Sequence, residues 1–373
     1  MDLDRYRKEF TITQTHVFLN HAANAPESNS VIAKINEYLN DARYGDAKEH
    51  QWIQYVDHLR GLVARFIGAS VDEIAFTANV SQGAALVANG LPWQENDNIV
   101  VPDNQFPANI YPWQNLIKKG VQVRKPVLSR NENYLAELQR CVDRRTKLLA
   151  LSLVEYDDGF RYDLEKISAF CSSKNVLLFL DAVQALGALK VDMEKNNVDF
   201  MATSGHKWLM GPLGQGFLYI KQKHIEDLYN IFSGWLSVVE PWQFHNHEQV
   251  EYKSAKRFEG GSYNLAGIAG LGAALEMILN IGIEEIESRV LGLSQYLVDR
   301  LIEKNYIVCS NLNKASRSGI TTFEHPQLEC ELVYEALKKS SVIVSKRNGR
   351  IRVSPHFYNN EDDIDRLIAA LPM

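Results

Sequence analysis

The amino-acid sequence predicts an α/β protein in which a mostly parallel sheet is covered by helices on both faces, with a smaller α+β domain. Short apolar runs, such as 147–153 and 176–180, alternate with helical segments such as 50–69 and 164–173. This alternation is typical of parallel sheets buried on both faces. The last third of the chain instead mixes long helices with short strands. A length of 373 residues also favours two domains over one.

The elements of the predicted large domain follow one another along the chain. Helices are predicted over 50–69, 80–90, 135–142 and 164–173, with a further helix that ends at 116–119. Strands are predicted over 74–77, 98–102, 121–124, 147–153, 176–180, 198–202 and 216–220. Ligands of such sheets bind outside the carboxyl ends of the strands. Residues that directly follow an apolar strand are therefore the first candidates for function.

The last third of the chain contains the end of the predicted large domain and most of the predicted small domain. Helices are expected over 266–279, 284–304, 331–339 and 360–371, and strands over 306–309, 320–323, 342–345 and 350–353. Because chain ends often meet, the N-terminal residues are expected to pack on the small domain. We therefore predict a large domain over 15–282 and a small domain made of 1–14 and 283–373.

Composition, charge and sequence pattern argue against several classes of function. Hydrophobic residues make up 46% and charged residues 23% of the chain, and the formal net charge is −6, which argues against a nucleic-acid or membrane surface. The apolar stretch 265–283 contains Glu276 and Asn280 and fits a buried helix better than a bilayer span. The first ten residues do not resemble a signal peptide. Four widely spaced cysteines lack metal-ligand spacing, so we expect reduced thiols, no metal and a cytoplasmic location.

Two residues after predicted strands carry the strongest chemical signal. Asp181 follows the apolar run 176–180, where it could cap a helix, bind a metal or pair with a cationic ligand nitrogen. Lys207 lies in the segment Ser-Gly-His-Lys-Trp, followed by glycines at 211, 214 and 216. Burial in such a turn would lower the pKa of a lysine and favour the nucleophilic amine. The flanking Ser204 and His206 offer donors suited to a phosphate.

The whole pattern Asp-x-x-Gln…Ser-Gly-His-Lys-x-x-x-Gly-Pro-x-Gly, from Asp181 to Gly214, closely resembles the class V aminotransferases of the fold-type I pyridoxal-phosphate enzymes. This group includes the cysteine desulfurases, and the resemblance extends from about Val17 to the C-terminus. It implies pyridoxal 5′-phosphate as cofactor and an amino acid as substrate. Lys207 would hold the cofactor as a Schiff base and move the substrate Cα proton. Asp181 would pair with the ring nitrogen, and Gln184 would hydrogen-bond the 3′-oxygen.

Further contacts follow from the resemblance. The turn 77–83 would bind the phosphate through the Val80 backbone and Ser81, although Ser81 could instead be a simple helix cap. Ser204 and His206 would complete this pocket. Phe106 would stack on the cofactor ring where many relatives have His, and its alternative is an ordinary core residue. Tyr156 would replace an Asn that contacts the cofactor in desulfurases.

The substrate and the subunit interface have candidates of their own. In 351–359 the sequence resembles the family's C-terminal Arg motif, which implies that Arg352 binds the substrate α-carboxylate, whereas a surface Arg is the alternative. His21 is expected only as a possible substrate contact. Ser262 matches a segment that reaches the neighbouring subunit's cofactor phosphate, which implies a homodimer. The region from Trp235 to His247 could belong to the pocket or to a dimer surface.

The reaction remains open between several alternatives. Desulfurases need a nucleophilic Cys shortly before the C-terminal Arg strand, and the segment 342–350 is short and has none. We therefore expect that the chain is not a persulfide-forming desulfurase, and Phe106 and Tyr156 favour a branch near isopenicillin N epimerase and kynureninase. Transamination is favoured over epimerisation and C–S or C–C cleavage. A catalytically silent binding protein is the alternative of another class. A nicotinamide-dependent oxidoreductase is disfavoured because no G-x-G-x-x-G follows the first strand.

Overall fold

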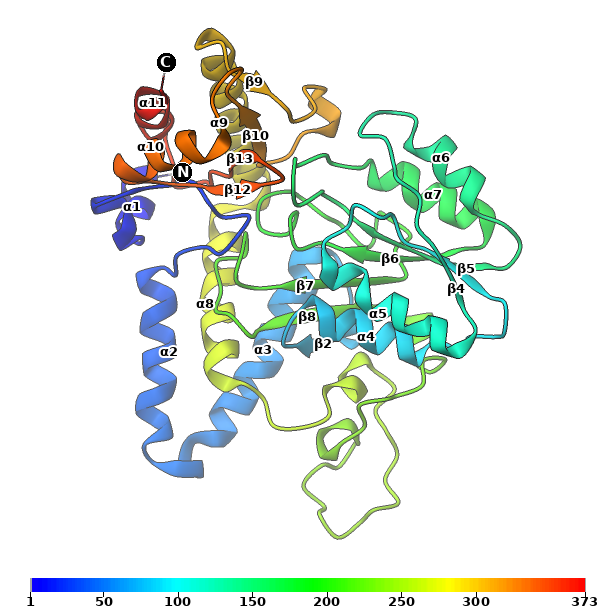
Figure 1. The fold of residues 1–373 in the computed structure, drawn as a ribbon. Coiled ribbons are helices and arrows are strands. Elements are labelled where there is room, and N and C mark those ends of the chain that lie inside the picture. Colours follow the sequence, from blue (N-terminus) through cyan, green and yellow to red (C-terminus); the bar gives the residue numbers. More distant parts are fainter. Residues whose placement is uncertain (1, 373) are drawn as a thin grey trace.

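The computed structural model describes residues 2–372 and is built around a seven-stranded sheet (Figure 1). The strand order is β2-β8-β7-β6-β5-β3-β4. The strands span Ile74–Thr77 (β2), Asn98–Val100 (β3), Gln122–Arg124 (β4), Thr146–Ser152 (β5), Leu177–Asp181 (β6), Phe200–Ser204 (β7) and Gly216–Ile220 (β8). Only β8 runs antiparallel to its neighbours β2 and β7. The predicted α/β class with a mostly parallel sheet is therefore confirmed.

Both faces of this sheet are buried under helices, which explains why its strands are apolar throughout. Along β5, Leu149 and Leu151 join one hydrophobic cluster, whereas Leu148 and Ala150 join another. This alternation follows from the two-residue period of a strand. The first cluster is completed by α3 (Glu49–Ile67), α6 (Tyr134–Cys141), α7 (Leu164–Lys174) and α8 (Leu265–Ile281). The second is completed by α4 (Val80–Gly90) and α5 (Tyr111–Gln114).

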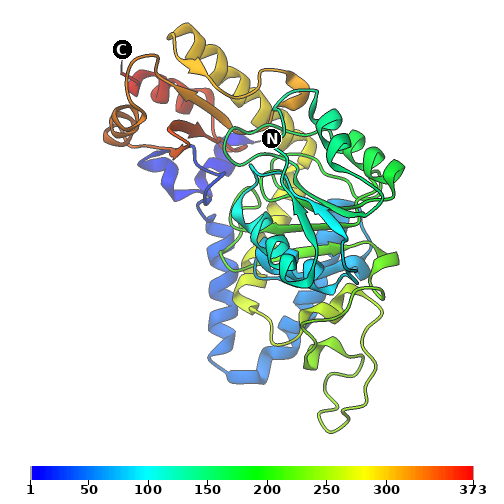
Figure 2. The same ribbon diagram turned by 45° about the vertical axis from the view of Figure 1, so that its right-hand side comes forward.

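The C-terminal part forms a second, smaller sheet beside the first (Figures 1 and 2). Its four strands lie in the order β12-β13-β10-β9 and are all antiparallel. They span Ile307–Val308 (β9), Thr321–Glu324 (β10), Ser345–Arg347 (β12) and Arg350–Val353 (β13). Helices α9 (Ile283–Glu303), α10 (Cys330–Lys339) and α11 (Glu361–Ala370) supply apolar residues to its core.

The N-terminal segment packs with this C-terminal part. Strand β1 (Val17–Phe18) pairs in parallel with β11 (Val342–Ile343), and the Arg7 side chain in α1 (Leu3–Lys8) binds Asp363 at 2.7 Å. Val17 and Leu19 lie in the same hydrophobic cluster as α9 and α11. The N-terminal contribution to this region thus extends to about residue 20 instead of ending at residue 14, because β1 is needed to cover β11. The division into two domains stays a prediction.

Helix α2 (Asn29–Ala42) begins at Ser28, whose hydroxyl accepts a hydrogen bond from the Val31 amide, and it packs along α8. Among residues 2–372, no single helix is long and apolar enough to cross a membrane. Only α8 and α9 taken together reach the required length and composition, and they meet at a bend of 84°.

Candidate active site

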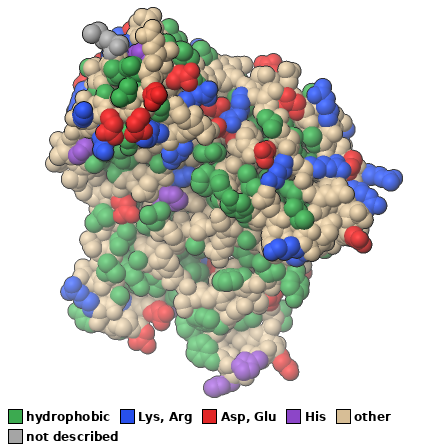
Figure 3. Space-filling view, in the orientation of Figure 1, with side chains coloured by type: hydrophobic (Ala, Val, Ile, Leu, Met, Phe, Trp, Pro, Cys, Tyr) green, Lys and Arg blue, Asp and Glu red, His purple; other side chains and the backbone are tan. Residues whose placement is uncertain are grey.

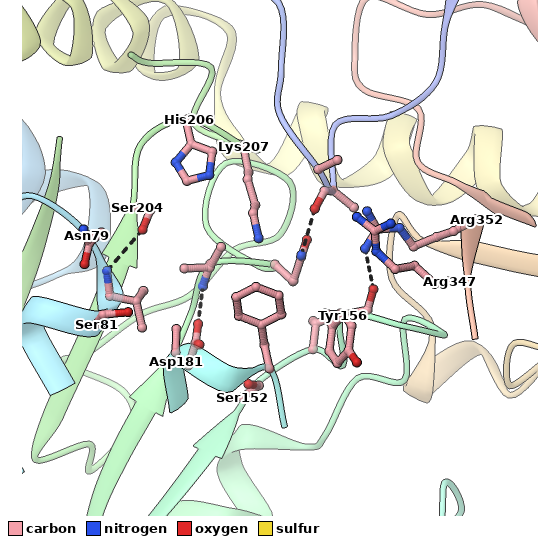
Figure 4. A pocket seen from close by; sticks show the side chains of 18 residues that line it. Asn79, Ser81, Ser152, Tyr156, Asp181, Ser204, His206, Lys207, Arg347 and Arg352 are labelled. Atoms are coloured by element: carbon pink, nitrogen blue, oxygen red, sulfur yellow. Dashed lines mark hydrogen bonds between the residues drawn. The ribbon is translucent and has the colours of Figure 1, made fainter. Parts of the chain in front are cut away.

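A cavity of about 290 Å³ lies at the carboxyl ends of β5, β6 and β7, next to the hairpin formed by β12 and β13 (Figure 4). The three strands end in Ser152, Asp181 and Ser204, and all three side chains line the cavity. The opposite wall carries Arg347 and Arg352. The position agrees with the rule that parallel sheets bind ligands outside the carboxyl ends of their strands.

Lys207 and Asp181 are buried together in this cavity. Burial lowers the pKa of Lys207 to about 8, and the nearby Asp181 carboxylate opposes this shift. Burial likewise raises the pKa of Asp181 to about 6, opposed by a hydrogen bond from the Val183 amide and by the charge of Lys207. No helix begins after Asp181, so the alternative of a helix cap does not hold. At neutral pH, roughly a tenth of the Lys207 side chains would carry the nucleophilic neutral amine.

The loop that carries Lys207 is held by hydrogen bonds on both sides of the lysine. The Gly205 amide donates to the Gln215 carbonyl at 2.7 Å, and the Trp208 indole donates to Gln184 Oε1 at 2.8 Å. Gly187 has a φ of +101°, and a Cβ there would lie 2.2 Å from the Trp208 carbonyl oxygen. Only glycine permits this approach. Gln184 also donates to the Ala22 carbonyl at 3.0 Å and keeps a second amide hydrogen for the cavity.

The start of helix α4 forms the end of the cavity that suits an anion. Asn79 caps this helix by accepting from the Gln82 amide, so Ser81 is not the cap and its side chain lines the cavity. The amides of the first turn have no carbonyl partner within the helix, and the Val80 amide donates to Ser204 Oγ at 3.1 Å. Burial lowers the pKa of His206 to about 4. At neutral pH His206 therefore offers a hydrogen bond without a charge.

Two aromatic residues, Phe106 and Tyr156, line the same cavity as the lysine and the arginines. The ring of Phe106 is 42% exposed, which excludes an ordinary core residue, and its centroid lies 5.2 Å from Lys207 Nζ. Tyr156 packs edge-to-face against Phe106 with ring centroids 5.3 Å apart. These two rings form an apolar wall against which a planar ligand could lie.

Arg352 is a buried guanidinium with one nitrogen left without a partner. Its Nη1 donates to the Tyr156 carbonyl at 2.5 Å and its Nε to Ser345 Oγ at 3.1 Å, but Nη2 is buried without a hydrogen bond. The alternative of a surface Arg is therefore wrong. Burial lowers the pKa of Arg352 to about 9, and the charge of Arg347 acts in the same direction. A buried donor of this kind fits the carboxylate of an amino acid.

Arg347 is a charged cavity residue that sequence reasoning missed. It lies on β12, where Ser345 pairs with Arg352 and Arg347 pairs with Arg350. The turn between the strands is Asn348-Gly349, both with positive φ, which is the strongest short signal for a two-residue hairpin. Reading this Asn-Gly pair as a hairpin turn would have placed Arg347 on the same face as Arg352.

A buried carboxyl group supports the segment behind Tyr156. Glu155 is inaccessible to solvent, and burial raises its pKa to about 8. Its Oε1 accepts from Gln105 and Tyr162, each at 2.8 Å, whereas Oε2 has no partner. Gln105 in turn accepts from the Ser152 amide at 2.5 Å. Glu155, which directly precedes Tyr156, is thus hydrogen-bonded to Gln105, which directly precedes Phe106.

Other predicted contacts do not line this cavity. His21 is fully buried, with Nδ1 on the Ser354 carbonyl and Nε2 on the Tyr358 hydroxyl. Its imidazole has no free nitrogen, so the structure contradicts a substrate contact; its neighbours Ala22 and Ala23 line the cavity instead. Ser262 is exposed and lies in a separate surface hollow.

The region from Trp235 to His247 also lies away from the cavity. Green side chains gather over the segment at the bottom of Figure 3, where Trp242 and Phe244 are more than half exposed and pack against each other. None of the residues of this region lines the cavity. Within one chain, it therefore does not contribute to the pocket.

Comparison with known proteins places this site in a family. The profile of the family described as Aminotransferase class-V matches residues 17–367. The chain belongs to this family. A protein named probable cysteine desulfurase from Pyrococcus abyssi is 30% identical over 98% of this chain and 96% of its own length. A cysteine desulfurase from Serratia proteamaculans is 29% identical over 99% of this chain and 97% of its own length.

Solved structures agree with this assignment. The apo cysteine desulfurase from Thermococcus onnurineus NA1 matches with a TM-score of 0.90 and 25% identity, covering 98% of this chain and 96% of that protein. The class-V member described here therefore has the fold of the fold-type I pyridoxal-phosphate enzymes, as predicted. The predicted cofactor, pyridoxal 5′-phosphate, is confirmed by the family.

One prediction about the reaction was wrong. The short segment before the C-terminal Arg strand led us to expect that the chain is not a persulfide-forming desulfurase, but relatives over its whole length carry the name cysteine desulfurase. The prediction failed because it rested on one short segment, whereas the similarity to these relatives extends over nearly the whole chain. Transamination, the favoured reaction, is not confirmed by these comparisons either.

Proposed function

We propose that this class-V enzyme cleaves the Cβ–S bond of cysteine or a related sulfur amino acid. The observation that carries the proposal is the buried pair Lys207 and Asp181, which faces the partly unpaired guanidinium of Arg352 across one cavity. An amino-acid substrate needs a base near its Cα and a group that binds its α-carboxylate. The cavity offers Lys207 for the first and Arg352 for the second. The names of the full-length relatives support the choice of sulfur as the leaving atom.

The cavity has groups that fit the cofactor. The amides at the start of α4, with Ser81, Ser204 and His206, offer neutral donors for its phosphate. Asp181 lies buried at the end of β6, where it would pair with the ring nitrogen, and Gln184 retains an amide hydrogen for the 3′-oxygen. Phe106 and Tyr156 offer the apolar face for the ring. Bound pyridoxal 5′-phosphate supplies an electron sink for negative charge at the substrate Cα.

The residues of the chain would then act on the substrate in turn. Arg352 binds the α-carboxylate and thereby orients the Cα–H bond toward Lys207. Lys207 in its neutral form removes the proton from Cα, and the electron pair released there expels sulfur from Cβ. Phe106 and Tyr156 would present an apolar surface to the substrate in this step. Asp181 keeps a positive charge favourable at the ring nitrogen because it stays ionised beside a cation.

Product analysis with L-cysteine tests the proposal. Elimination releases sulfide and ammonia and leaves the carbon skeleton as pyruvate, whereas transfer of the sulfur to an added thiol, which becomes a persulfide, leaves alanine. Transamination would instead leave a keto acid that retains the sulfur. Mass spectrometry of the carbon product together with a sulfide assay in the presence of a thiol separates the reactions. A sulfur-containing keto acid as the main product would contradict the proposal.

We also propose that the chain acts as a homodimer in which Ser262 reaches the partner's phosphate site. Ser262 is exposed and lies outside the cavity of its own chain, in a hollow next to Gln82 on the start of α4. Sedimentation analysis would show the dimer. A monomer with full activity would contradict this proposal. A cytoplasmic location stays a prediction.

A further inference from the structure

Arg347 lies in the cavity without a carboxylate partner. It is half-buried, lines the cavity beside Arg352, and makes one hydrogen bond among the described residues, from Nη1 to the Lys346 carbonyl at 2.7 Å. Among the described residues Arg347 forms no ion pair, and Asp157 and Asp158, on the segment after Tyr156, both pair with Arg130. The guanidinium of Arg347 therefore has capacity for an anion that the protein itself does not supply.

The positive charge on this wall exceeds what one α-carboxylate requires. A carboxylate is well satisfied by one planar guanidinium fork, and Arg352 already offers a buried, unpartnered Nη2. Figure 4 shows that the ends of the two arginine side chains lie next to each other at one side of the cavity. Their charges disfavour each other. Negative charge bound beside them would offset this repulsion, and Arg347 is available for a second anionic group besides the one on Arg352.

The positions of the two arginines in the cavity suggest which part of a substrate carries the second charge. The phosphate-binding end lies at the start of α4, on the far side of Lys207 from the arginines (Figure 4). Phe106 and Tyr156 pack against each other and offer an apolar surface in the same cavity. Because Arg347 lies beside Arg352, a substrate whose α-carboxylate binds Arg352 would bring the end of a short side chain close to Arg347.

We propose that Arg347 is a specificity-determining residue that binds a second anionic group at the end of the substrate's side chain. The substrate class is then an amino acid whose sulfur-bearing side chain ends in a carboxylate or a sulfur oxyanion. This inference rests on the proposed function only for the statement that the cavity takes an amino acid. The neutral side chain of cysteine would occupy the same cavity without using Arg347.

Binding of unreactive acids tests this inference independently of turnover. Isothermal titration of the holoenzyme with succinate and with butyrate compares a dicarboxylate with a monocarboxylate of the same chain length. Wild type should bind succinate about ten- to a hundredfold more tightly, the range for a charged hydrogen bond, and Arg347→Gln should remove the difference. Arg350→Gln is the matched control, because Arg350 lies on the same hairpin, pairs with Glu324 and does not line the cavity.

The outcomes separate the alternatives. If Arg347→Gln weakens succinate and butyrate equally, both arginines serve one carboxylate and the inference is wrong. Equal affinity of the two acids for wild type would also overturn it. Retention of the succinate preference in Arg350→Gln but not in Arg347→Gln would support it, provided that circular dichroism shows both variants to be folded.

Turnover distinguishes this inference from the proposed function. The ratio of kcat/KM for S-carboxymethyl-L-cysteine to that for S-ethyl-L-cysteine should fall by about tenfold or more in Arg347→Gln. If neither compound is cleaved but the succinate preference persists, C–S cleavage fails and the anion site stands. If both are cleaved with an equal ratio in wild type and variant, the anion site fails and C–S cleavage stands.

Discussion

The two walls of the cavity differ in how their polar groups are satisfied. The floor consists of the ends of parallel strands and the start of α4, where Asp181 accepts from the Val183 amide and Ser204 from the Val80 amide. The opposite wall is an antiparallel hairpin, where Arg352 keeps a buried nitrogen unpaired and Arg347 has no carboxylate. The floor is thus organised by the protein alone, whereas the wall is completed by an anionic ligand.

This difference separates the expected defects. Changes in the floor should disturb the cofactor and the chemical step for every substrate, because the floor holds the groups that we propose to act at Cα. Changes in the wall should disturb the binding of particular substrates and leave the cofactor in place. Single substitutions in the floor and in the wall test this difference.

Lys207→Ala is expected to have the largest effect. It removes the group that bonds the cofactor and moves the Cα proton, so activity should fall by more than about a thousandfold. Borohydride treatment of wild type, followed by peptide mass spectrometry, should place the reduced cofactor on Lys207, and the variant should show none. Lys190→Ala, at an exposed ion pair with Glu284, is the control. A reducible cofactor in the Lys207 variant would refute the assignment.

Asp181→Asn should have the second largest effect, with a loss of about a hundredfold in kcat for every substrate. It should also change the pH dependence of cofactor uptake by the apoprotein. Uptake requires the neutral amine, so its rate should rise with pH through the wild-type Lys207 pKa of about 8. The Asp181 carboxylate raises that pKa, so the variant's midpoint should be lower. A midpoint that moves upward would contradict the pairing.

Arg352→Gln should raise KM for amino acids by about tenfold to a hundredfold and leave the absorption of bound cofactor unchanged. Because the variant removes a buried cation with an unpaired nitrogen, its thermal unfolding temperature should not fall. A spectral titration with an amino acid measures the first effect and calorimetry the second. If the variant instead loses its cofactor and keeps its KM, Arg352 serves cofactor binding and not substrate binding.

Glu155→Gln should have the smallest effect on activity and a measurable one on stability. The folded-state pKa of Glu155 is raised to about 8 from an ordinary 4.5, so the folded protein binds the proton more tightly than the unfolded chain. Wild type should therefore lose stability, on the order of a few kcal/mol, as pH rises from 5 to 8, and the variant should lose less. Urea unfolding at both pH values gives the comparison. Parallel curves would show that Glu155 is already ionised.

Sequence reasoning placed the elements of the large sheet well because each depends on local residues. Strand 74–77 and helix 80–90 were predicted at their observed bounds, Ile74–Thr77 and Val80–Gly90. The strand before Lys207 was predicted two residues early, over 198–202 instead of Phe200–Ser204. Apolarity locates a buried strand, but the hydrogen bonds to β6 and β8 decide where it ends.

The candidate site shows the same limit at single residues. Asp181, Ser204 and Lys207 follow directly from strand ends, and the structure brings them to one cavity. The prediction for His21 failed because its neighbours in the sequence do not reveal its contacts. Ser354 and Tyr358, more than 300 residues away, hydrogen-bond both of its ring nitrogens.

By itself, the sequence determined the parallel sheet, the residues at its strand ends and the resemblance to a pyridoxal-phosphate family. These depend on patterns of a few neighbouring residues, which local backbone geometry converts directly into position. Only the tertiary structure decided that Arg347 faces the cavity with Arg352 and that His21 does not. Both outcomes depend on how the small sheet docks against the large one, and that docking is set by packing between segments more than a hundred residues apart.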